Sequence, residues 1–323
     1  MRKTIVDFLK DNSDEFLSGE KIAKKIGISR AAVWKHIQNL RKNGYKILSR
    51  ENFGYKLEEV PNLLLPDEIQ YNLNTQIIGK NISYHDNIDS TNRVAKELAN
   101  NGADDGTIVI AEQQFAGKGR LGRSFFSPKS KSILLSILLR PKMMPQGAAK
   151  FTLLAAVAVA NAMKRFDLKA EIKWPNDILY DNRKIVGILT EINTEIGQIN
   201  YIVVGIGINV NINREEFPSE IRDIAASLSE MKGENISRID FLKALLEEFD
   251  KLYLEIIQNG FDNVLSQWRE FNITLGKNIK VIPAGSDDEF FAVAEDIDNE
   301  GALIIRTQNG LEKVYAGDVS IRE

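Results

Sequence analysis

The sequence predicts an α+β chain of several domains, with a winged helix-turn-helix first, an α/β layer domain next and a group of short strands last. Two helical stretches meet at a glycine within residues 19–44, strand-like and helical stretches alternate over residues 81–271, and residues 275–323 hold only short strand-like runs. A chain of 323 residues has room for two or three domains of about 150 residues each. The domains that we expect are residues 1–62, 63–271 and 272–323.

The composition excludes several classes of protein. The chain has no cysteine and only two histidines, His36 and His85, which excludes disulfides, cysteine nucleophiles, thiolate zinc sites and multi-histidine metal centres. The longest apolar run, residues 153–160, is too short to cross a bilayer. The N-terminus turns acidic at Asp7 and has no apolar signal-peptide core. We therefore expect a cytoplasmic protein without a membrane partner.

Charge is unevenly distributed along the chain. The net charge is −3, but residues 1–60 hold 13 basic residues against 8 acidic ones, so the remainder is acidic. A basic module on an acidic body is typical of a protein in which only that module meets a polyanion such as DNA. A solvated helical surface would produce the same bias.

The first domain has the pattern of a helix-turn-helix. A helix begins after Ser18 and ends at Gly27, because glycine accepts the left-handed conformation of a tight helix exit. Ser29 then caps a second helix, whose apolar residues recur at helical spacing from Val33. Two strand-like runs within residues 47–57 predict a wing. The DNA-binding residues that we expect are Ser29, Arg30, Lys35, His36 and Gln38.

A small helical protein-binding domain is the alternative interpretation of this module. The glycine turn and the basic exposed face favour DNA.

The strongest local feature of the central domain is Gly-Lys-Gly-Arg-Leu-Gly-Arg at residues 117–123. It has the glycine spacing of a dinucleotide-binding loop, but no helix follows it and residues 113–166 contain no acid, so that fold is excluded. The P-loop pattern does not fit it either. Glycines allow close backbone approach, and Lys118, Arg120 and Arg123 predict an anion clamp. A solvated basic loop is the alternative.

Four weaker motifs accompany this loop. They are Asp-Ser-Thr-Asn at 89–92 before a helix at 93–100, Lys-Trp-Pro-Asn-Asp at 173–177, a strand that opens with Arg183-Lys184, and Gly-Ile-Gly-Ile-Asn at 205–209. The missing side chains of the last motif leave room for a ligand or a second backbone. Taken singly, the first is an ordinary helix cap and the second an Asx turn.

The C-terminal residues predict short strands separated by turns. Strand-like runs occur at 279–282, 289–294, 301–306 and 313–315, with turn residues Pro283, Gly285, Asp298-Asn299 and Asn309-Gly310 between them. Asn-Gly is a strong hairpin signal. We interpret this region as a small SH3-like β-barrel, and a purely structural cap is the alternative to a functional role.

Taken in this order, the motifs resemble those of the biotin–protein ligases. With the helix-turn-helix they resemble the bifunctional members of that family, the biotin-operon repressors. The resemblance spans nearly the whole chain, and residues 117–123 and 173–177 are its specific marks. Two positions depart from the family: Lys118 stands where many members have arginine, and Phe125 where a tryptophan often packs on adenine. The resemblance implies a class II synthetase-like ligase domain with a mixed sheet.

The resemblance also implies an activity. Such ligases join biotin to ATP as biotinyl-5′-AMP, with magnesium on the phosphates, and pass biotin to a lysine of a biotin carboxyl carrier protein. The implied biotin-binding residues are Ser90, Thr91, Asn92, Gln114, Lys118, Gly119, Arg120, Lys184 and Gly187. The implied ATP- and adenylate-binding residues are Lys118, Arg120, Arg123, Phe125, Asn176, Asp177 and Asn209. Lys184 and Arg120 are the catalytic residues that we expect, and no metal site built by the protein alone is expected.

A bifunctional member would in addition bind operator DNA as a homodimer when the adenylate is present. Two other functions stay open at this stage. A lipoate or octanoyl ligase would share the α/β core, although the loop at 117–123 and the turn at 173–177 weigh against it. A ligand-sensing repressor without catalysis would share the whole domain order.

Overall fold

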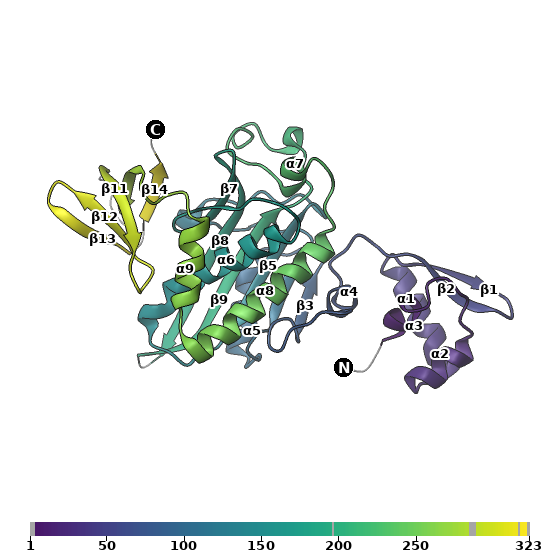
Figure 1. The fold of residues 1–323 in the computed structure, drawn as a ribbon. Helices are drawn as coiled ribbons and strands as arrows, with labels where there is room; N and C mark the ends of the chain where they lie inside the picture. Colours follow the sequence, from purple (N-terminus) through teal and green to yellow (C-terminus); the bar gives the residue numbers. More distant parts are fainter. Residues whose placement is uncertain (1–3, 196, 284–288, 316, 322–323) are drawn as a thin grey trace. The chain divides into compact units, whose positions relative to one another are not determined.

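The computed structural model describes residues 4–195, 197–283, 289–315 and 317–321 (Figure 1). Contacts divide the chain into two compact units, residues 1–72 and 73–323. This division falls later than the boundary expected after residue 62, because helix α4 (Pro66–Gln70) belongs to the first unit. Its buried Glu68 accepts a hydrogen bond from the Tyr45 hydroxyl at 2.7 Å and forms an ion pair with Lys10.

The N-terminal unit confirms the predicted helix-turn-helix. Its elements are helices α1 (Ile5–Lys10), α2 (Gly19–Ile26) and α3 (Arg30–Lys42) and strands β1 (Lys46–Arg50) and β2 (Gly54–Glu59). Ser18 and Ser29 cap α2 and α3 through their side chains, and Gly27 ends α2 with a φ of 78°. Strands β1 and β2 pair antiparallel as a wing. Local capping signals therefore place the helix boundaries where the sequence predicts them.

A mixed seven-stranded sheet forms the centre of the second unit. Its strand order is β3-β4-β5-β9-β8-β7-β6, in which β3 and β4 are parallel and all other neighbours antiparallel. The strands are β3 (Ile82–His85), β4 (Ile108–Ala111), β5 (Ser132–Leu139), β6 (Glu171–Lys173), β7 (Asp177–Tyr180), β8 (Arg183–Glu195) and β9 (Gln198–Asn209). Every residue of β5 is buried, as expected for a strand covered on both faces.

Helices cover both faces of this sheet. Helix α5 (Thr91–Asn100) packs through Ala95 and Ala99 on Leu134, Leu138 and Val203. The remaining helices are α6 (Lys150–Lys164), α7 (Leu228–Lys232), α8 (Arg238–Asn259) and α9 (Asp262–Phe271), together with short 3-10 turns at Arg120–Gly122, Pro145–Ala149 and Arg214–Glu216. Helix α6 contacts α8, α9 and the sheet, so these helices form a second layer (Figure 1). Helix α5 starts at Thr91, earlier than the expected 93–100, because Ser90 takes the cap position.

The C-terminal strands form a separate antiparallel sheet of order β13-β12-β11-β10-β14. Its strands are β10 (Asn278–Pro283), β11 (Phe290–Ile297), β12 (Leu303–Thr307), β13 (Gly310–Val314) and β14 (Gly317–Ile321). The hairpin predicted at Asn309-Gly310 joins β12 to β13, and β14 adds a strand that the sequence pattern did not indicate. Gly285 lies outside the described residues. These pairings confirm an antiparallel sheet, and the SH3-like barrel stays a prediction.

The central turn at 173–177 anchors the C-terminal sheet. Trp174 is buried, its backbone amide donates to Thr274 Oγ1 at 3.0 Å, and its indole donates to the Gly301 carbonyl at 3.3 Å.

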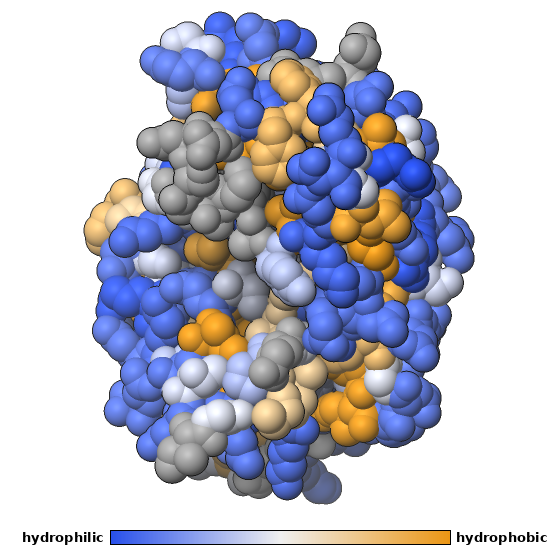
Figure 2. All heavy atoms as spheres, turned by 90° about the vertical axis from the view of Figure 1, so that its left-hand side faces the viewer, coloured by the Kyte–Doolittle hydropathy of each residue, from blue (hydrophilic) through white to orange (hydrophobic). Residues whose placement is uncertain are grey.

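Figure 2 shows hydrophobic residues on one face as small separate patches among hydrophilic ones. Among the described residues, none of the helices combines the length and the apolar character that crossing a bilayer requires.

Candidate functional site

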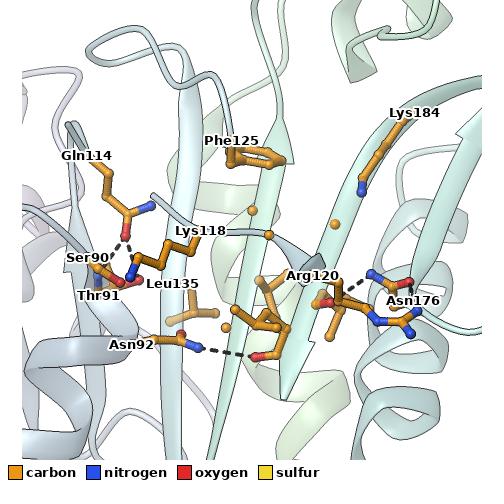
Figure 3. A pocket seen from close by; sticks show the side chains of 17 residues that line it. Ser90, Thr91, Asn92, Gln114, Lys118, Arg120, Phe125, Leu135, Asn176 and Lys184 are labelled. Carbon is orange, nitrogen blue, oxygen red and sulfur yellow. Dashed lines mark hydrogen bonds between the residues drawn. The ribbon is translucent and has the colours of Figure 1, made fainter. Parts of the chain in front are cut away.

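Residues from distant parts of the second unit meet around one hollow (Figure 3). Its lining residues are Ser90, Thr91, Asn92, Gln114, Lys118, Gly119, Arg120, Phe125, Leu135, Asn176, Lys184, Gly187, Ile188, Leu189, Gly205, Ile206 and Gly207. All the residues that the sequence assigned to biotin are among them. The sequence assigned no role to Leu135, Ile188 or Leu189 and singled out Ile206 only as part of the motif at 205–209, because an apolar strand residue carries no signal that separates a cavity wall from core.

One end of the hollow is polar and is built at the start of α5. The Thr91 amide and hydroxyl both donate to Gln114 Oε1, at 2.6 and 3.0 Å. Ser90 occupies the N-cap position but makes no side-chain cap hydrogen bond. Its hydroxyl therefore remains available at the wall of the hollow, beside Lys118 (Figure 3).

Asn92 forms the floor of this end and is held by a buried network. Its amide nitrogen donates to the Leu189 carbonyl at 3.2 Å and to Glu191 Oε2 at 2.8 Å, and its oxygen accepts from the Ser136 hydroxyl. Lys96 donates to the other Glu191 oxygen at 2.8 Å. Both amide protons of Asn92 are thus used within the protein, so Asn92 shapes the hollow more than it donates into it.

Neighbouring hydrogen-bond donors and positive charges lower the pKa of the Glu191 carboxyl. Burial raises the pKa of its carboxyl, but hydrogen bonds from Lys96 and Asn92 and the positive charges of Lys96 and Lys118 outweigh burial. The net pKa lies below the usual range of a glutamate, so the carboxylate is ionised at neutral pH.

Glycines of β8 and β9 let side chains of the hollow pack directly against the sheet. A Cβ on Gly205 would lie 2.2 Å from Asn92 Oδ1, and one on Gly207 would lie 2.8 Å from the Phe125 ring. A Cβ on Gly187 would lie 2.9 Å from the Lys184 side chain. The room expected for a ligand at 205–209 is therefore used by side chains of the protein itself, which wall the hollow.

The other end of the hollow is cationic. Arg120 donates to Asn176 Oδ1 at 3.1 Å, and Lys184 pairs with Asp177 at 2.6 Å. Figure 3 shows Arg120, Asn176 and Lys184 together at this end, with Phe125 between them and the polar end. Within the loop, the Gly119 amide donates to the Arg123 carbonyl at 2.6 Å and the Phe125 amide to the Gly117 carbonyl at 3.1 Å. These bonds join residues of the same loop and so fix its shape.

Three residues assigned to the nucleotide do not line this hollow. Arg123 is exposed on the loop. Asp177 stands behind Lys184 as its ion-pair partner. Asn209 is buried and donates to the Ala226 carbonyl at 3.1 Å, while its side-chain oxygen has no hydrogen-bond partner. That buried oxygen is an acceptor ready for a donor.

The hollow is narrow, at about 60 Å³, whereas small-molecule sites usually span roughly 300–1,000 Å³. A second hollow of about 250 Å³ adjoins it, and both are lined by Arg120, Asn176, Ile188 and Leu189. The second hollow is also lined by residues of α6, by the Trp174-Pro175 turn, and by Gly301 and Tyr315. Within the described part of the chain, no three Asp, Glu or His side chains gather as a metal site would need.

The N-terminal unit has a separate concave surface between α3 and the wing. Its volume is about 640 Å³, and it is lined on α3 by Arg30, Trp34 and Gln38 and on the wing by residues 49–52. Trp34 is 58% exposed. Arg41 donates to the Ile47 carbonyl and so ties the wing to α3.

The structure separates the residues expected to bind DNA. Arg30 and Gln38 line the concave surface, while Lys35 and Ser29 are exposed and Ser29 is used as the α3 cap. His36 instead lines a different hollow with residues of α1 and with Asp67. His36 is exposed as expected but does not line the concave surface with Arg30 and Gln38, and its contact with DNA stays a prediction. The sequence missed Trp34 on that surface.

Comparisons with known proteins agree with this geometry. Residues 84–209 match the Biotin/lipoate A/B protein ligase family, residues 2–56 match an HTH domain, and residues 274–322 match the Biotin protein ligase C terminal domain. The chain is 39% identical to the bifunctional ligase/repressor BirA of Bacillus subtilis, over 99% of this chain and 98% of that protein. The chain belongs to the biotin protein ligase family.

Further biotin protein ligases resemble the chain over most of its length. The bifunctional ligase/repressor BirA of Escherichia coli is 33% identical over 95% of this chain and 94% of that protein. The solved biotin protein ligase of Aquifex aeolicus, in complex with biotin and ATP, superposes with a TM-score of 0.64 at 26% identity and covers 75% of this chain and 99% of its own. The predicted membership of the bifunctional branch is therefore confirmed.

We expect Glu191→Gln to change how the thermal midpoint of the protein depends on pH. Because the folded-state pKa of Glu191 is lowered, its ionised form stabilises the fold above its unfolded pKa of about 4.3, and this contribution is lost as pH falls through the folded value. The midpoint difference between wild type and variant should be largest at neutral pH and shrink in acid. Thermal unfolding at several pH values measures it.

Glu195→Gln, an exposed position on the same strand, is the control. A midpoint difference for Glu191→Gln that is the same at neutral and acid pH would contradict the account of its charge.

Proposed function

We propose that this protein is an ATP-dependent biotin–protein ligase that also acts as a biotin-responsive transcriptional repressor. It activates biotin as biotinyl-5′-AMP and transfers biotin to a lysine of a biotin carboxyl carrier protein. One observation carries the proposal: Lys118 and Arg120 of one loop and Lys184 of β8 converge on a single hollow, which the polar groups of Ser90, Thr91 and Gln114 also line. The reactions take place in the cytoplasm, where ATP, the carrier protein and DNA are all present.

The chemistry explains why the cations are needed. Forming the adenylate requires the biotin carboxylate to attack the α-phosphorus of ATP, with pyrophosphate as the leaving group. Both reactants are anions, and fixed cations in a site with little water offset their repulsion and stabilise the charge that develops. Lys184 neutralises the reacting carboxylate and α-phosphate, and Arg120 holds the phosphates from the loop.

The polar end suits the ring system of biotin. A cyclic urea offers one carbonyl acceptor and two N–H donors, and Ser90, Thr91 and Gln114 supply hydroxyl and amide groups at that end. Asn92 sets the depth of this end, and Lys118 and Gly119 close over the acyl chain. Because the hollow is narrow, Lys118 and Phe125 move aside when substrate enters.

The nucleotide lies toward Asn176, Asp177 and Asn209. Asn209 is buried and supports this end from behind, through its hydrogen bond to the Ala226 carbonyl, and Phe125 offers a ring on which adenine can stack. Arg123 reaches the phosphates from the exposed loop. Magnesium fits this end as well, since the Asp177 carboxylate is the oxygen ligand that it prefers. When bound, magnesium neutralises phosphate charge, and Asp177 would hold it beside Lys184.

The second half of the reaction moves the acyl group to the carrier. The carrier lysine, as the free amine, attacks the acyl carbon, a C–N bond forms, and the C–O bond to AMP breaks. A mixed anhydride hydrolyses in open water, so the loop at 117–123 must also cover it until the carrier arrives.

The concave surface between α3 and the wing is the DNA-binding site of the repressor. Arg30, Gln38 and Trp34 face bases and backbone of the operator. Two copies of the chain, joined when the adenylate is bound, place two such surfaces on two half-sites. Sedimentation velocity with and without adenylate tests this assembly, and an unchanged sedimentation coefficient would argue against it.

The central test uses purified protein with biotin, ATP, magnesium and a biotin-carrier domain. Lysine biotinylation of the carrier, together with biotin-dependent ATP–pyrophosphate exchange, is the expected result. Binding of biotin without exchange would identify a sensor that lacks catalysis. A larger thermal shift with lipoate than with biotin would indicate a lipoate ligase instead.

We expect Lys184→Ala to lose adenylate formation and keep the fold. The lysine is a half-exposed partner of Asp177, so its loss costs little stability, whereas losing a cation at the developing charge slows the reaction by about 10²- to 10³-fold. Pyrophosphate release measures the reaction. Lys169→Ala, which removes an exposed lysine paired with Glu171, is the matched control. Equal pyrophosphate release by the two variants would rule out the role given to Lys184.

We expect Arg120→Gly to release the adenylate early. Arg120 joins the loop to Asn176, so its loss removes the bond that holds the loop across the site, and dissociation should speed up by at least about tenfold. Trapping of released adenylate measures the rate. Lys129→Gly, in the same chain segment but paired with Asp86, is the control. An unchanged off-rate in Arg120→Gly would refute the covering role.

We expect Arg30→Ala to weaken DNA binding by about 1–3 kcal/mol and His36→Ala to leave it nearly unchanged. Arg30 lines the concave surface of α3 and the wing, and His36 does not. Fluorescence anisotropy on a duplex selected by the wild-type protein from a random library measures both affinities. Equal losses in the two variants would show that DNA contacts a different face of α3.

A further inference from the structure

A buried ion pair lies at the edge of the central sheet, and none of the steps above uses it. Arg238 is the first residue of α8, and Glu112 follows the last residue of β4. The guanidinium donates to Glu112 Oε2 at 2.9 Å, and both side chains are 0% exposed. Removing two charges from water costs free energy. The attraction between the charges offsets this cost only when their geometry is good and both partners are present. The loss of either partner would therefore leave an unpaired buried charge at this place in the fold.

The same guanidinium binds both ends of the substrate loop. We define this loop as residues 113–131, which include Gln114, Lys118, Arg120 and Phe125. Glu112 immediately precedes it and Ser132 immediately follows it, and Arg238 also donates to the Ser132 carbonyl at 3.0 Å. The Ser130 amide donates to the Glu112 carbonyl at 3.3 Å, which closes the loop at its base.

Arg238 also stands at the end of a second loop, residues 210–237, which follows β9. The Asn211 side chain closes this loop, since it donates to the Ile236 carbonyl at 2.8 Å and accepts from the Ile236 amide at 2.9 Å. The Lys131 carbonyl accepts from the amides of Val210 and Asn211, at 3.2 and 2.9 Å. The two loops therefore share one base.

Each loop reaches the hollow from this base. The first loop brings Gln114 to Thr91. In the second loop, the Ile224 carbonyl accepts from the Lys184 amide at 2.8 Å and the Ala226 amide donates to the Lys184 carbonyl at 2.9 Å. One loop thus sets the polar end of the hollow and the other the backbone of the cationic end.

We propose that Arg238 and Glu112 are positioning residues of the ligase reaction, which hold the two loops in a fixed relation to each other. They are not among the lining residues of the hollow, and they act through the loop bases. The inference rests on the proposed ligase function. Because the polar and cationic ends depend on one shared base, losing the pair impairs binding of biotin and of ATP together.

The test uses the full chain with three variants: Arg238→Met, Glu112→Gln, and the double variant Glu112→Leu/Arg238→Met. In the single Arg238→Met variant, KM for biotin and for ATP should each rise by about 10- to 100-fold, because misplaced loops misplace the substrates. Glu112→Gln keeps a hydrogen-bond acceptor, so its KM values for biotin and for ATP should lie between those of Arg238→Met and wild type. The double variant leaves no unpaired buried charge, so its thermal midpoint should recover while both KM values stay raised.

Asp250→Asn is the matched control. Asp250 is another buried acid of the same unit, and it accepts hydrogen bonds from the amides of Gln76, Ile77 and Ile78. Its loss should lower the thermal midpoint and leave both KM values unchanged.

Amide hydrogen exchange provides a readout that is independent of activity. In the ligand-free protein, the double variant should exchange faster than wild type in residues 113–131 and in residues 210–237, and the Asp250 variant in neither. A double variant with wild-type stability and wild-type KM values, or one in which only one loop exchanges faster, would overturn the inference. If wild-type protein lacks biotin-dependent pyrophosphate exchange, the proposed function fails, and hydrogen exchange still decides whether the pair holds both loops.

Discussion

The constraint on which this structure depends is that two anions must be brought together and kept from water. The cations that offset the repulsion of these anions do not all lie in one segment of the chain. The fold instead brings Lys118 and Arg120 from a loop and Lys184 from the start of β8 to one hollow. Asp177 holds Lys184, and Asn176 accepts from Arg120, so these two cations are held in place before any substrate arrives.

The mixed sheet provides the surface on which this convergence is possible. Gly205 and Gly207 on β9 and Gly187 on β8 leave space above the strands, and Asn92, Phe125 and Lys184 lie in that space. A side chain at any of these glycines would displace a residue of the wall. The small volume of the hollow follows from the same packing, since side chains of the protein fill the space above these glycines. A site of this kind excludes water and protects a reactive anhydride.

The adenylate has two roles in the proposed function. It is the reactive intermediate that the carrier lysine consumes, and it is the signal that reports excess biotin to the repressor. Both roles require that the adenylate stay bound, one until the carrier arrives and the other while the operator is occupied. The loop at 117–123 and its buried base therefore serve regulation as well as catalysis, and a change that loosens them affects both.

The sequence by itself determined the features that depend on a few neighbouring residues. Ser18, Ser29 and Gly27 predicted the ends of the N-terminal helices, because caps and turns act locally. Only the tertiary structure decided which residues share a surface: Trp34 joins Arg30 beside the wing while His36 turns away, and Leu135 lines the hollow while Arg123 does not. Pairings such as Leu134 with Gly207 join strands far apart in the chain. Such contacts arise from packing of the whole domain, and short-range sequence patterns do not predict them.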